Sequence, residues 1–404
     1  MSLYGSLFTG VSGLAAQSNA MSMISNNIAN VNTVGYKGNI ASFSSLVTDG
    51  NKTANGPYSP GGVLSSANST INKQGILQQT ESSTDMAVTG SGFFVVSRDG
   101  NFTDDLPMYT RAGSFSVDET GVLRNSNGYV LMGTAPTAPG VFPPPGDVRD
   151  LVPVNVAITD NLASPTTEAS IVMNLNAGDA VTAAPAYNFS RGITVYDTLG
   201  GPHELQLNFR KTSANNWEVS SNATAATLPI VFDPATGNPT SPPVLNLTGV
   251  NWGTGFAPQD IAIDLSKITQ FSAASSVTNV DQNGAELGRR TGVSVSDDGF
   301  VTANFSNGET QRLYRVDLAT FVNPEGLGEK SGNVYIETEN SGGNNIRIAG
   351  SNGAGMISAS SLESSNIDLA EEFSRMIVTQ RAYSANTKTI STADQMLTEL
   401  LQLR

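Results

Sequence analysis

The chain carries few side chains that could perform acid–base, nucleophilic or metal chemistry. It has no cysteine and a single histidine, His203. Thiol catalysis, disulfide scaffolds and thiolate metal sites are therefore excluded, and imidazole chemistry is limited to one ring. His203 stands beside Glu204 at the start of an expected strand, without an obvious nucleophile as partner. That setting is typical of a surface strand residue.

Two acidic pairs and one glycine-rich loop are the other candidates. Asp104-Asp105 and Asp297-Asp298 lack the regular ligand spacing of a calcium loop, so we expect them in turns. Residues 350–355 (GSNGAG) follow a short apolar run, but their glycine spacing is the reverse of a dinucleotide-binding loop. We therefore predict no catalytic residue, no cofactor and no metal, and do not expect an enzyme.

Length and composition narrow the class of protein. The 404 residues allow two or three domains at about 150 residues each. The net charge of −14 disfavours binding to nucleic acid or to an anionic membrane. The first charged residue is Lys37, and before it the apolar residues are interleaved with polar ones, so neither a secretory signal nor a membrane span fits. A cytoplasmic protein and one exported by another route both stay open.

The C-terminal segment predicts a long helix. Ser365-Asn-Ile-Asp368 has the spacing of a capping-box start, and no Pro or Gly interrupts residues 365–404. An apolar row recurs every seven residues, and a companion row four residues later turns polar in its middle. The apolar row is Leu369, Met376, Tyr383, Ile390 and Leu397, and the companion row is Phe373, Gln380, Thr387, Asp394 and Leu401.

The N-terminal segment repeats the pattern. Its apolar row is Leu7, Leu14, Met21 and Ile28, and its companion row is Tyr4, Val11, Ser18 and Ser25. Either the two helices pair only with each other or cap a core, or other copies of the chain complete each stripe. We favour the second reading, because a stable two-stranded coiled coil usually has two apolar rows. The expected assembly interface is Leu7, Val11, Leu14, Met21, Ile28, Leu369, Phe373, Met376, Tyr383, Ile390, Leu397 and Leu401.

Between the helices the hydrophobic period changes to two. Residues 92–97, 109–117, 128–133, 289–296, 300–306 and 309–318 are strand-like. Fifteen of the 19 prolines fall in 134–260, which also holds the strand-like runs 191–197, 203–210, 215–220 and 259–265. The prediction is an α+β chain with a coiled-coil-like helical domain and two nested all-β domains. The expected boundaries are 1–30 and 365–404 for the helices, 31–70 for a linker, 71–133 and 285–364 for an inner β domain, and 134–284 for an inserted outer β domain.

Residues 25–38 (SNNIANVNTVGYKG) resemble the N-terminal signature of the bacterial flagellar rod and hook family. Residues 90–96 (GSGFFVV) and 109–133 resemble its first β domain, and 364–404 resemble its C-terminal helix. The likeness covers roughly 1–133 and 285–404. The residues that carry the signature are Asn26, Asn27, Ala29, Asn30, Asn32, Gly35, Tyr36, Lys37, Gln380, Arg381 and Tyr383.

The resemblance implies a structural subunit that polymerises into a tube. The extra β domain is most similar to hook members of the family, whose polymer is a flexible joint that transmits torque from the motor to the filament. The implied partners are copies of the chain, the distal rod, the cap, the length-control and filament-junction proteins, and the type III export apparatus. Neither nucleic acid nor direct membrane insertion is implied, and the location is the extracellular flagellum, reached without a cleaved signal. The alternatives are a distal-rod-type subunit and a secreted β-rich adhesin.

Overall fold

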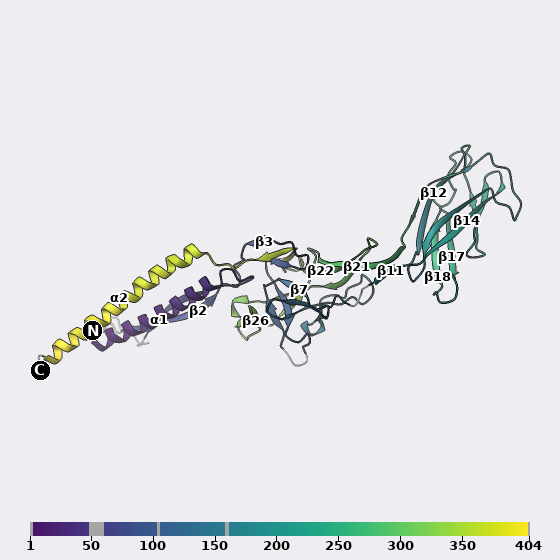
Figure 1. Ribbon diagram of the computed structural model, residues 1–404. Coiled ribbons are helices and arrows are strands. Elements are labelled where there is room, and N and C mark those ends of the chain that lie inside the picture. Colours follow the sequence, from purple (N-terminus) through teal and green to yellow (C-terminus); the bar gives the residue numbers. More distant parts are fainter. Residues whose placement is uncertain (1–2, 48–59, 103–105, 158–160, 403–404) are drawn as a thin grey trace. The chain divides into compact units, whose positions relative to one another are not determined.

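The chain is mostly β structure with one long helix near each end (Figure 1). The computed structural model describes residues 3–47, 60–102, 106–157 and 161–402. Its contacts form two compact units. The first unit holds Met1–Ile158, Val293–Thr302 and Gln311–Arg404, and the second unit holds Thr159–Gly292 and Ala303–Thr310.

The two helices, α1 (Leu3–Ala29) and α2 (Leu369–Gln402), pack against each other in the first unit. Helix α2 begins later than the capping-box pattern predicts. Asp368 supplies the cap, because its Oδ1 accepts hydrogen bonds from the amides of Ala370 at 2.8 Å and Glu371 at 3.3 Å. Ser365 lies before the helix and does not cap it, so that expectation was wrong.

Residues 31–70 are not the simple linker that the sequence suggests. They contain the antiparallel strands β1 (Asn39–Val47) and β2 (Pro60–Ser69), which lie along α1. Asn19 Nδ2 donates to Ser65 Oγ at 3.1 Å, and the Val63 amide donates to Ser12 Oγ at 3.2 Å. Serine and glycine dominate β2, so little hydrophobic alternation marks it as a strand.

The first unit also contains a ten-stranded sheet with the central order β25-β26-β6-β5-β9-β8-β7. Strand β5 is fully buried, and the rings of Tyr109 and Phe321 pack edge to face in the core. The strand expected over 109–117 is interrupted between β6 and β7, where the Met86 amide donates to the Gly113 carbonyl at 3.0 Å. The backbones approach so closely there that a Cβ at Gly113 would lie only 1.6 Å from the carbonyl oxygen of Met86. The remaining elements are β3 (Leu77–Gln79), β4 (Met86–Thr89), β5 (Phe93–Ser97), β6 (Met108–Thr110), β7 (Phe115–Val117), β8 (Leu123–Asn125), β9 (Val130–Gly133), the 3-10 turns η1 (Val148–Asp150) and η2 (Pro324–Gly326), β10 (Val152–Pro153), β24 (Leu318–Thr320), β25 (Gly328–Lys330), β26 (Val334–Ile336), β27 (Asn345–Arg347), β28 (Met356–Ala359) and β29 (Ser361–Glu363).

The second unit is built from two sheets that share one apolar core. One sheet has the order β17-β18-β12-β19, with β20 also paired to β12, and the other has the order β13-β14-β15-β16. Trp217 is fully buried between them and its Nε1 donates to Gln270 Oε1 at 3.1 Å. The strands are β12 (Glu168–Asn176), β13 (Phe189–Tyr196), β14 (Pro202–Ser213), β15 (Asn216–Ser221), β16 (Thr227–Val231), β17 (Val244–Val250), β18 (Gln259–Asp264), β19 (Ile268–Phe271) and β20 (Ser276–Gln282). They confirm the four strand-like runs expected here.

The expected start of the inserted domain at residue 134 differs from the structure. Strand β10 pairs with β9, and Val154 and Val156 are buried, so residues 134–157 stay with the first unit. The three consecutive prolines 143–145 also belong to the first unit, where Arg315 Nη2 donates to the Pro143 carbonyl at 2.9 Å. A further sheet consists of β11 (Asn161–Ser164), β21 (Ala285–Val295), β22 (Phe300–Phe305) and β23 (Thr310–Arg315), in that order.

Candidate assembly surface

Small residues line the contact between α1 and α2. Ala16 and Ala20 are 3% exposed, and Ala393 on the other helix is 2% exposed. A Cβ at Gly10 would lie 2.9 Å from Ile390 Cγ1. The two helices therefore approach closely along a glycine- and alanine-rich seam, which Ile390 of the expected heptad row reaches opposite Gly10.

Most of the expected interface side chains lie beside this seam or away from it. Val11 and Phe373 are 56% and 50% exposed. Leu369 and Tyr383 are also exposed, whereas Leu7, Leu14, Met21, Ile28, Met376, Ile390 and Leu397 are half-buried. The side chain of Leu401 is outside the described part of the chain. Counting by sevens found Ile390, but it missed the small residues Gly10, Ala16, Ala20 and Ala393, where the helices pack most closely.

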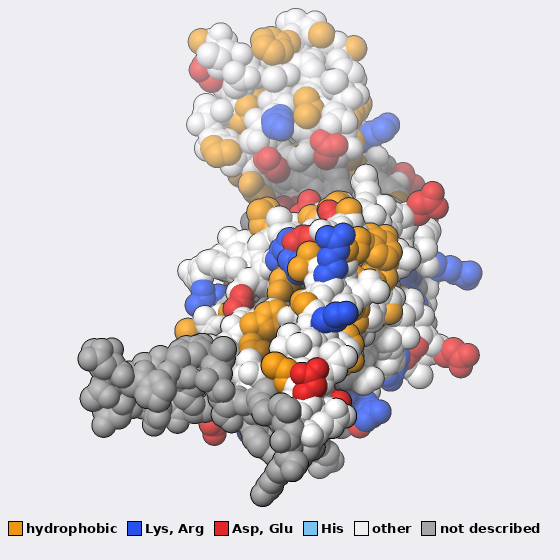
Figure 2. Space-filling model, turned by 90° about the vertical axis from the view of Figure 1, so that its left-hand side faces the viewer, with side chains coloured by type: hydrophobic (Ala, Val, Ile, Leu, Met, Phe, Trp, Pro, Cys, Tyr) orange, Lys and Arg blue, Asp and Glu red, His pale blue; other side chains and the backbone are white. Residues whose placement is uncertain are grey.

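The helix pair consequently presents apolar side chains to solvent. Phe8 on α1 is 58% exposed, and Ile377 and Val378 on α2 are 52% and 64% exposed. Figure 2 views the molecule from the side on which Figure 1 shows the helices, with orange apolar side chains reaching the surface between charged ones. Exposed apolar groups that gather on one element mark an interaction surface better than scattered ones do.

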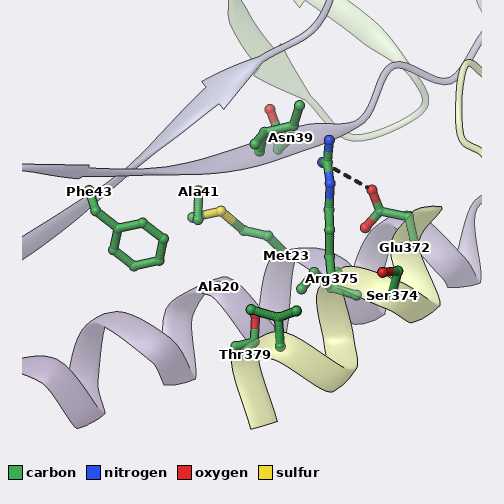
Figure 3. Close-up of a pocket in the computed structure, with 12 residues that line it drawn as sticks. Ala20, Met23, Asn39, Ala41, Phe43, Glu372, Ser374, Arg375 and Thr379 are labelled. Atoms are coloured by element: carbon green, nitrogen blue, oxygen red, sulfur yellow. Dashed lines mark hydrogen bonds and ion pairs between the residues drawn. The ribbon is translucent and has the colours of Figure 1, made fainter. Parts of the chain in front are cut away.

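A groove opens where α1, α2 and strand β1 meet (Figure 3). Its volume is about 390 Å³, and Met23, Ala41, Phe43 and Val378 contribute apolar walls. Its polar lining includes Arg375, whose Nη1 lies 3.3 Å from Glu372 Oε1. The groove is thus an apolar hollow with a charged edge, which suits an apolar side chain.

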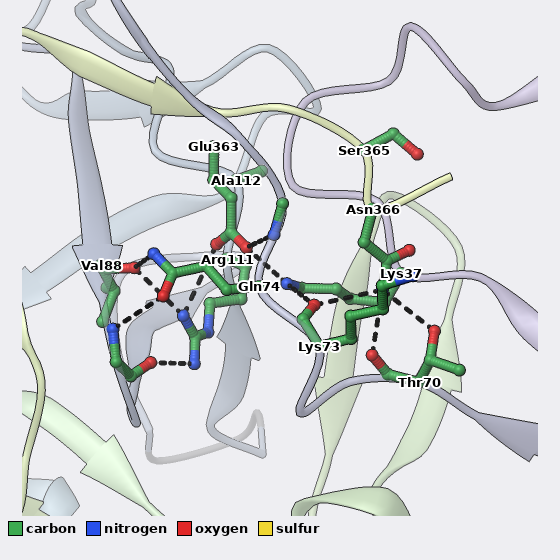
Figure 4. A network of polar contacts seen from close by, with 12 residues as sticks. Lys37, Thr70, Lys73, Gln74, Val88, Arg111, Ala112, Glu363, Ser365 and Asn366 are labelled. Carbon is green, nitrogen blue, oxygen red and sulfur yellow. Dashed lines mark hydrogen bonds and ion pairs between the residues drawn. The ribbon is translucent and has the colours of Figure 1, made fainter. Parts of the chain in front are cut away.

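Three fully buried charges lie where the helices join the β core (Figure 4). Lys37 Nζ lies 2.5 Å from Glu363 Oε1 and donates to the Lys73 carbonyl at 2.8 Å. Arg111 Nη1 lies 3.5 Å from the other carboxylate oxygen of Glu363. Burial lowers the pKa of Lys37 below its usual value, and the charge of Glu363 opposes that lowering.

Backbone contacts surround these charges. The Gly75 amide donates to Glu363 Oε1 at 2.8 Å, and the Gly35 amide donates to the Glu363 carbonyl at 2.7 Å. Gly35 has φ +67°, and a Cβ there would lie 2.6 Å from the Ala112 amide nitrogen. Only glycine combines this conformation with so close an approach.

Asn27 is the most connected residue of the signature segment. It is 1% exposed. Its Nδ2 donates to the Asn39 carbonyl at 2.9 Å and to Glu372 Oε2 at 3.3 Å, and its Oδ1 accepts from the Tyr36 hydroxyl at 3.3 Å. Asn27 thereby ties α1 to both α2 and β1.

The other signature residues divide into local contacts and exposed positions. Asn30 Nδ2 donates to the Asn26 carbonyl at 2.9 Å, which closes the end of α1. Ala29, Asn32, Gln380 and Arg381 are exposed. The sequence did not point to Arg111, Glu363 or Asn366, because no local pattern links positions so far apart along the chain.

The residues first considered for chemistry make structural contacts. His203 Nε2 lies 2.7 Å from Asp197 Oδ2, and the imidazole stacks on Trp252 with ring centroids 4.5 Å apart. Asp297 accepts a hydrogen bond from the Ala359 amide at 3.0 Å. The pair Asp104-Asp105 lies outside the described residues.

The glycine-rich loop 350–355 closes on itself, with the Gly350 amide donating to the Gly355 carbonyl at 2.8 Å. Within the described residues, no group of three or more acidic or histidine side chains is placed to hold a metal ion. Neither described helix has a stretch apolar enough to span a membrane.

Four family models match successive parts of the chain. Residues 7–37 match the flagella basal body rod protein family, and residues 87–171 match the flagellar hook protein FlgE/F/G D1 domain. Residues 161–285 match the flagellar basal body protein FlaE D2 domain. Residues 358–403 match the C-terminal family of the flagellar basal body rod FlgEFG proteins.

Several curated relatives match the chain along its whole length. The flagellar hook protein FlgE of Brucella suis is 37% identical over 100% of both chains, as is that of Rhizobium meliloti. The Escherichia coli flagellar hook protein FlgE is 33% identical over 98% of both. A crystal structure of a Helicobacter pylori flagellar hook protein covers 71% of this chain and 100% of its own, with 17% identity and a TM-score of 0.49. On the identity and coverage of its relatives, this chain belongs to the flagellar hook protein FlgE family.

Proposed function

We propose that the chain is a structural subunit that self-assembles into the tubular flagellar hook and transmits torque from the rod to the filament. Its family consists of structural hook proteins, not enzymes. The observation that carries the assembly step is the apolar face of the helix pair, where Phe8, Phe373 and Val378 are each at least half exposed.

The partner that covers this face is a second copy of the chain. The groove beside Phe43 has apolar walls and lies along the C-terminal half of α1. The exposed apolar side chains of Phe8 and Val11, here called knobs, lie in the N-terminal half of the same helix. Knob and groove are different surfaces of one chain. A contact between two different surfaces does not close on itself as a twofold dimer does: it generates a ring where the rotation between copies closes, and an open helical polymer, as proposed here, where it does not. In the proposed tube, the helix pairs of neighbouring copies pack together and form a coiled-coil-like inner layer.

The rest of the chain takes its place around that inner layer. In the proposed tube, the sheet of the first unit forms an inner β domain and the second unit forms an outer one. Only 14% of the residues of the whole chain are charged, and weak polar contacts between copies can exchange as a joint bends, whereas buried ion pairs would resist breaking.

The flagellar context supplies the other partners. They are the distal rod, the hook cap, the length-control and filament-junction proteins, and the type III export apparatus. The first 36 residues lack charge, and export without a cleaved signal to the extracellular flagellum is consistent with them. The comparisons with hook proteins over the full chain support this assignment.

The decisive experiment changes the exposed helix face and leaves the seam intact. The double variant Phe373→Ser with Val378→Ser should keep the far-UV circular dichroism and tryptophan fluorescence of the parent chain, yet form no tubes in electron micrographs. Val181→Ser, at a side chain that is 62% exposed in the second unit, is the matched control and should form tubes. Tubes from the double variant at the parent concentration would refute the proposal.

A further inference from the structure

Three chain segments connect the helix pair and the β1–β2 strand pair to the rest of the first unit, here called the β core. All three segments meet at one point. They are 34–38 after α1, 70–76 after β2, and 363–366 before α2. Asn366 joins them, because its Oδ1 accepts from the Gly38 amide at 2.9 Å and its Nδ2 donates to the Thr70 carbonyl at 3.0 Å. Both helices are therefore joined to the β core through segments that one asparagine ties together.

The buried charges lie inside this junction. Lys37 comes from the first segment and Glu363 from the third, and their side chains have no exposed surface. Arg111, with a side chain 5% exposed, reaches in from the β core and also donates to the Gly90 carbonyl at 2.7 Å. Figure 4 shows the carboxylate of Glu363 between the two cationic side chains.

Burying charge in this way is an inefficient means of adding stability. Removing charges from water costs several kcal/mol each, and a buried ion pair often contributes no more than well-packed apolar residues would. Backbone hydrogen bonds and close-packed glycines already hold the same segments together. A buried ion pair differs from these contacts because it favours one arrangement of the segments. If the segments shifted relative to one another, a buried charge would lose its partner.

We infer that Lys37, Arg111 and Glu363 form a buried charge latch that fixes the direction in which the helix pair leaves the β core. Glu363 is its positioning residue, because its carboxylate contacts both cations and accepts a hydrogen bond from the Gly75 amide. In the proposed hook, which this inference presupposes, the latch gives every subunit the same helix direction and so sets whether copies can assemble. The junction is then a rigid coupling between assembly helices and β core.

Charge counting provides the test. With two cations and one anion, the latch carries a net charge of +1. Glu363→Gln raises this buried charge to +2, and adding Lys37→Met returns it to +1 without restoring the contact. The matched control is Glu218→Gln, which makes the same chemical change in the partly exposed Arg210–Glu218 pair of the second unit.

Three readouts are needed on the full chain. Urea unfolding is followed by far-UV circular dichroism for the helices and by tryptophan fluorescence for the second unit, which holds both tryptophans. Amide hydrogen exchange is measured on peptides that cover 34–38 and 70–76. Tube formation is followed by light scattering and electron microscopy.

The latch predicts a separation between stability and assembly. Glu363→Gln should lower the urea midpoint of the helical signal and speed junction exchange at least tenfold, while the tryptophan transition stays in place. The double variant should recover most of the lost midpoint, yet both should assemble at least tenfold more slowly than the parent chain. Glu218→Gln should change none of the junction readouts.

Three results would overturn the inference. One is unchanged exchange and assembly in Glu363→Gln. Another is parental assembly by the double variant once its midpoint has recovered, because the charges would then act only through stability. The third is a double variant no more stable than Glu363→Gln, which would contradict the charge count. If the parent chain itself formed no tubes, the proposed function would fail, and the midpoint and exchange readouts would still decide on the latch.

Discussion

Gly13 of α1 lies directly against Asn386 of α2. A Cβ at Gly13 would stand 2.7 Å from Nδ2 of that asparagine and 3.0 Å from its Cγ, closer than real Cβ atoms come to neighbouring groups. At Gly5, near the N-terminal end of the same helix, an added Cβ would have no neighbouring atom within 4 Å. The close contact between the helices therefore leaves no room for a side chain at Gly13, whereas Gly5 has room for one.

Gly13→Val should weaken the helix pair. The added methyl groups must displace Asn386 or push the helices apart, and overpacking of this kind costs about 1–3 kcal/mol. Gly5→Val is the control and should leave stability nearly unchanged, because its side chain enters open space. Thermal melts at 222 nm compare the two variants, and equal melting points would show that the seam is not tightly packed.

Trp217→Ala should destabilise the second unit by about 3–5 kcal/mol, since it removes the largest fully buried side chain of the chain's described part and leaves a cavity. The effect should be confined to that unit. Trp252 remains as the fluorescent reporter there, so its denaturant midpoint should fall while the helical circular dichroism transition stays. A parallel fall of both transitions would argue against two units that unfold separately.

The Asp118 carboxyl group should make the stability of the folded chain depend on pH in the acidic range. Its carboxylate accepts from the Thr120 hydroxyl at 2.6 Å and from Arg124 Nε at 2.7 Å, and these contacts hold its pKa far below the usual value. A depressed carboxyl pKa contributes stability above the unfolded value of about 3.9, and that contribution is lost as the pH falls toward the folded pKa.

The melting temperature of the parent chain should therefore exceed that of Asp118→Asn at pH 7, and the difference should shrink steadily below about pH 4. Glu119→Gln changes the neighbouring carboxylate and serves as the control. A difference between parent and Asp118→Asn that grows in acid would reverse the sign of this account.

The sequence predicted the elements whose signals are local. Strands such as Phe93–Ser97 and Phe300–Phe305 stand between turn residues and have buried-type or alternating patterns, and the structure has them within a residue or two of the expected limits. The absence of helix breakers from 365–404 likewise predicted a long C-terminal helix, and α2 begins only where Asp368 can cap it.

The sequence failed where the signal is not local. The β1–β2 hairpin has a serine-rich second strand, and its position depends on packing against α1, which no periodicity reports. The seam residues were missed because glycine and alanine carry little hydrophobic signal. Glu363 was missed because its partners, Lys37 and Arg111, are distant in sequence and meet only in the folded chain.

In the proposed polymer, other copies of the chain cover the apolar face of the helix pair. Because the chain has no cysteine, a single Val378→Cys substitution gives one thiol on that face, and Val181→Cys gives one in the second unit. Both should react quickly with a maleimide in the monomer. In assembled tubes the thiol of Val378→Cys should react at least tenfold more slowly, because a neighbouring copy covers it, while that of Val181→Cys should still react. Equal labelling of Val378→Cys in monomer and tube would contradict the claim.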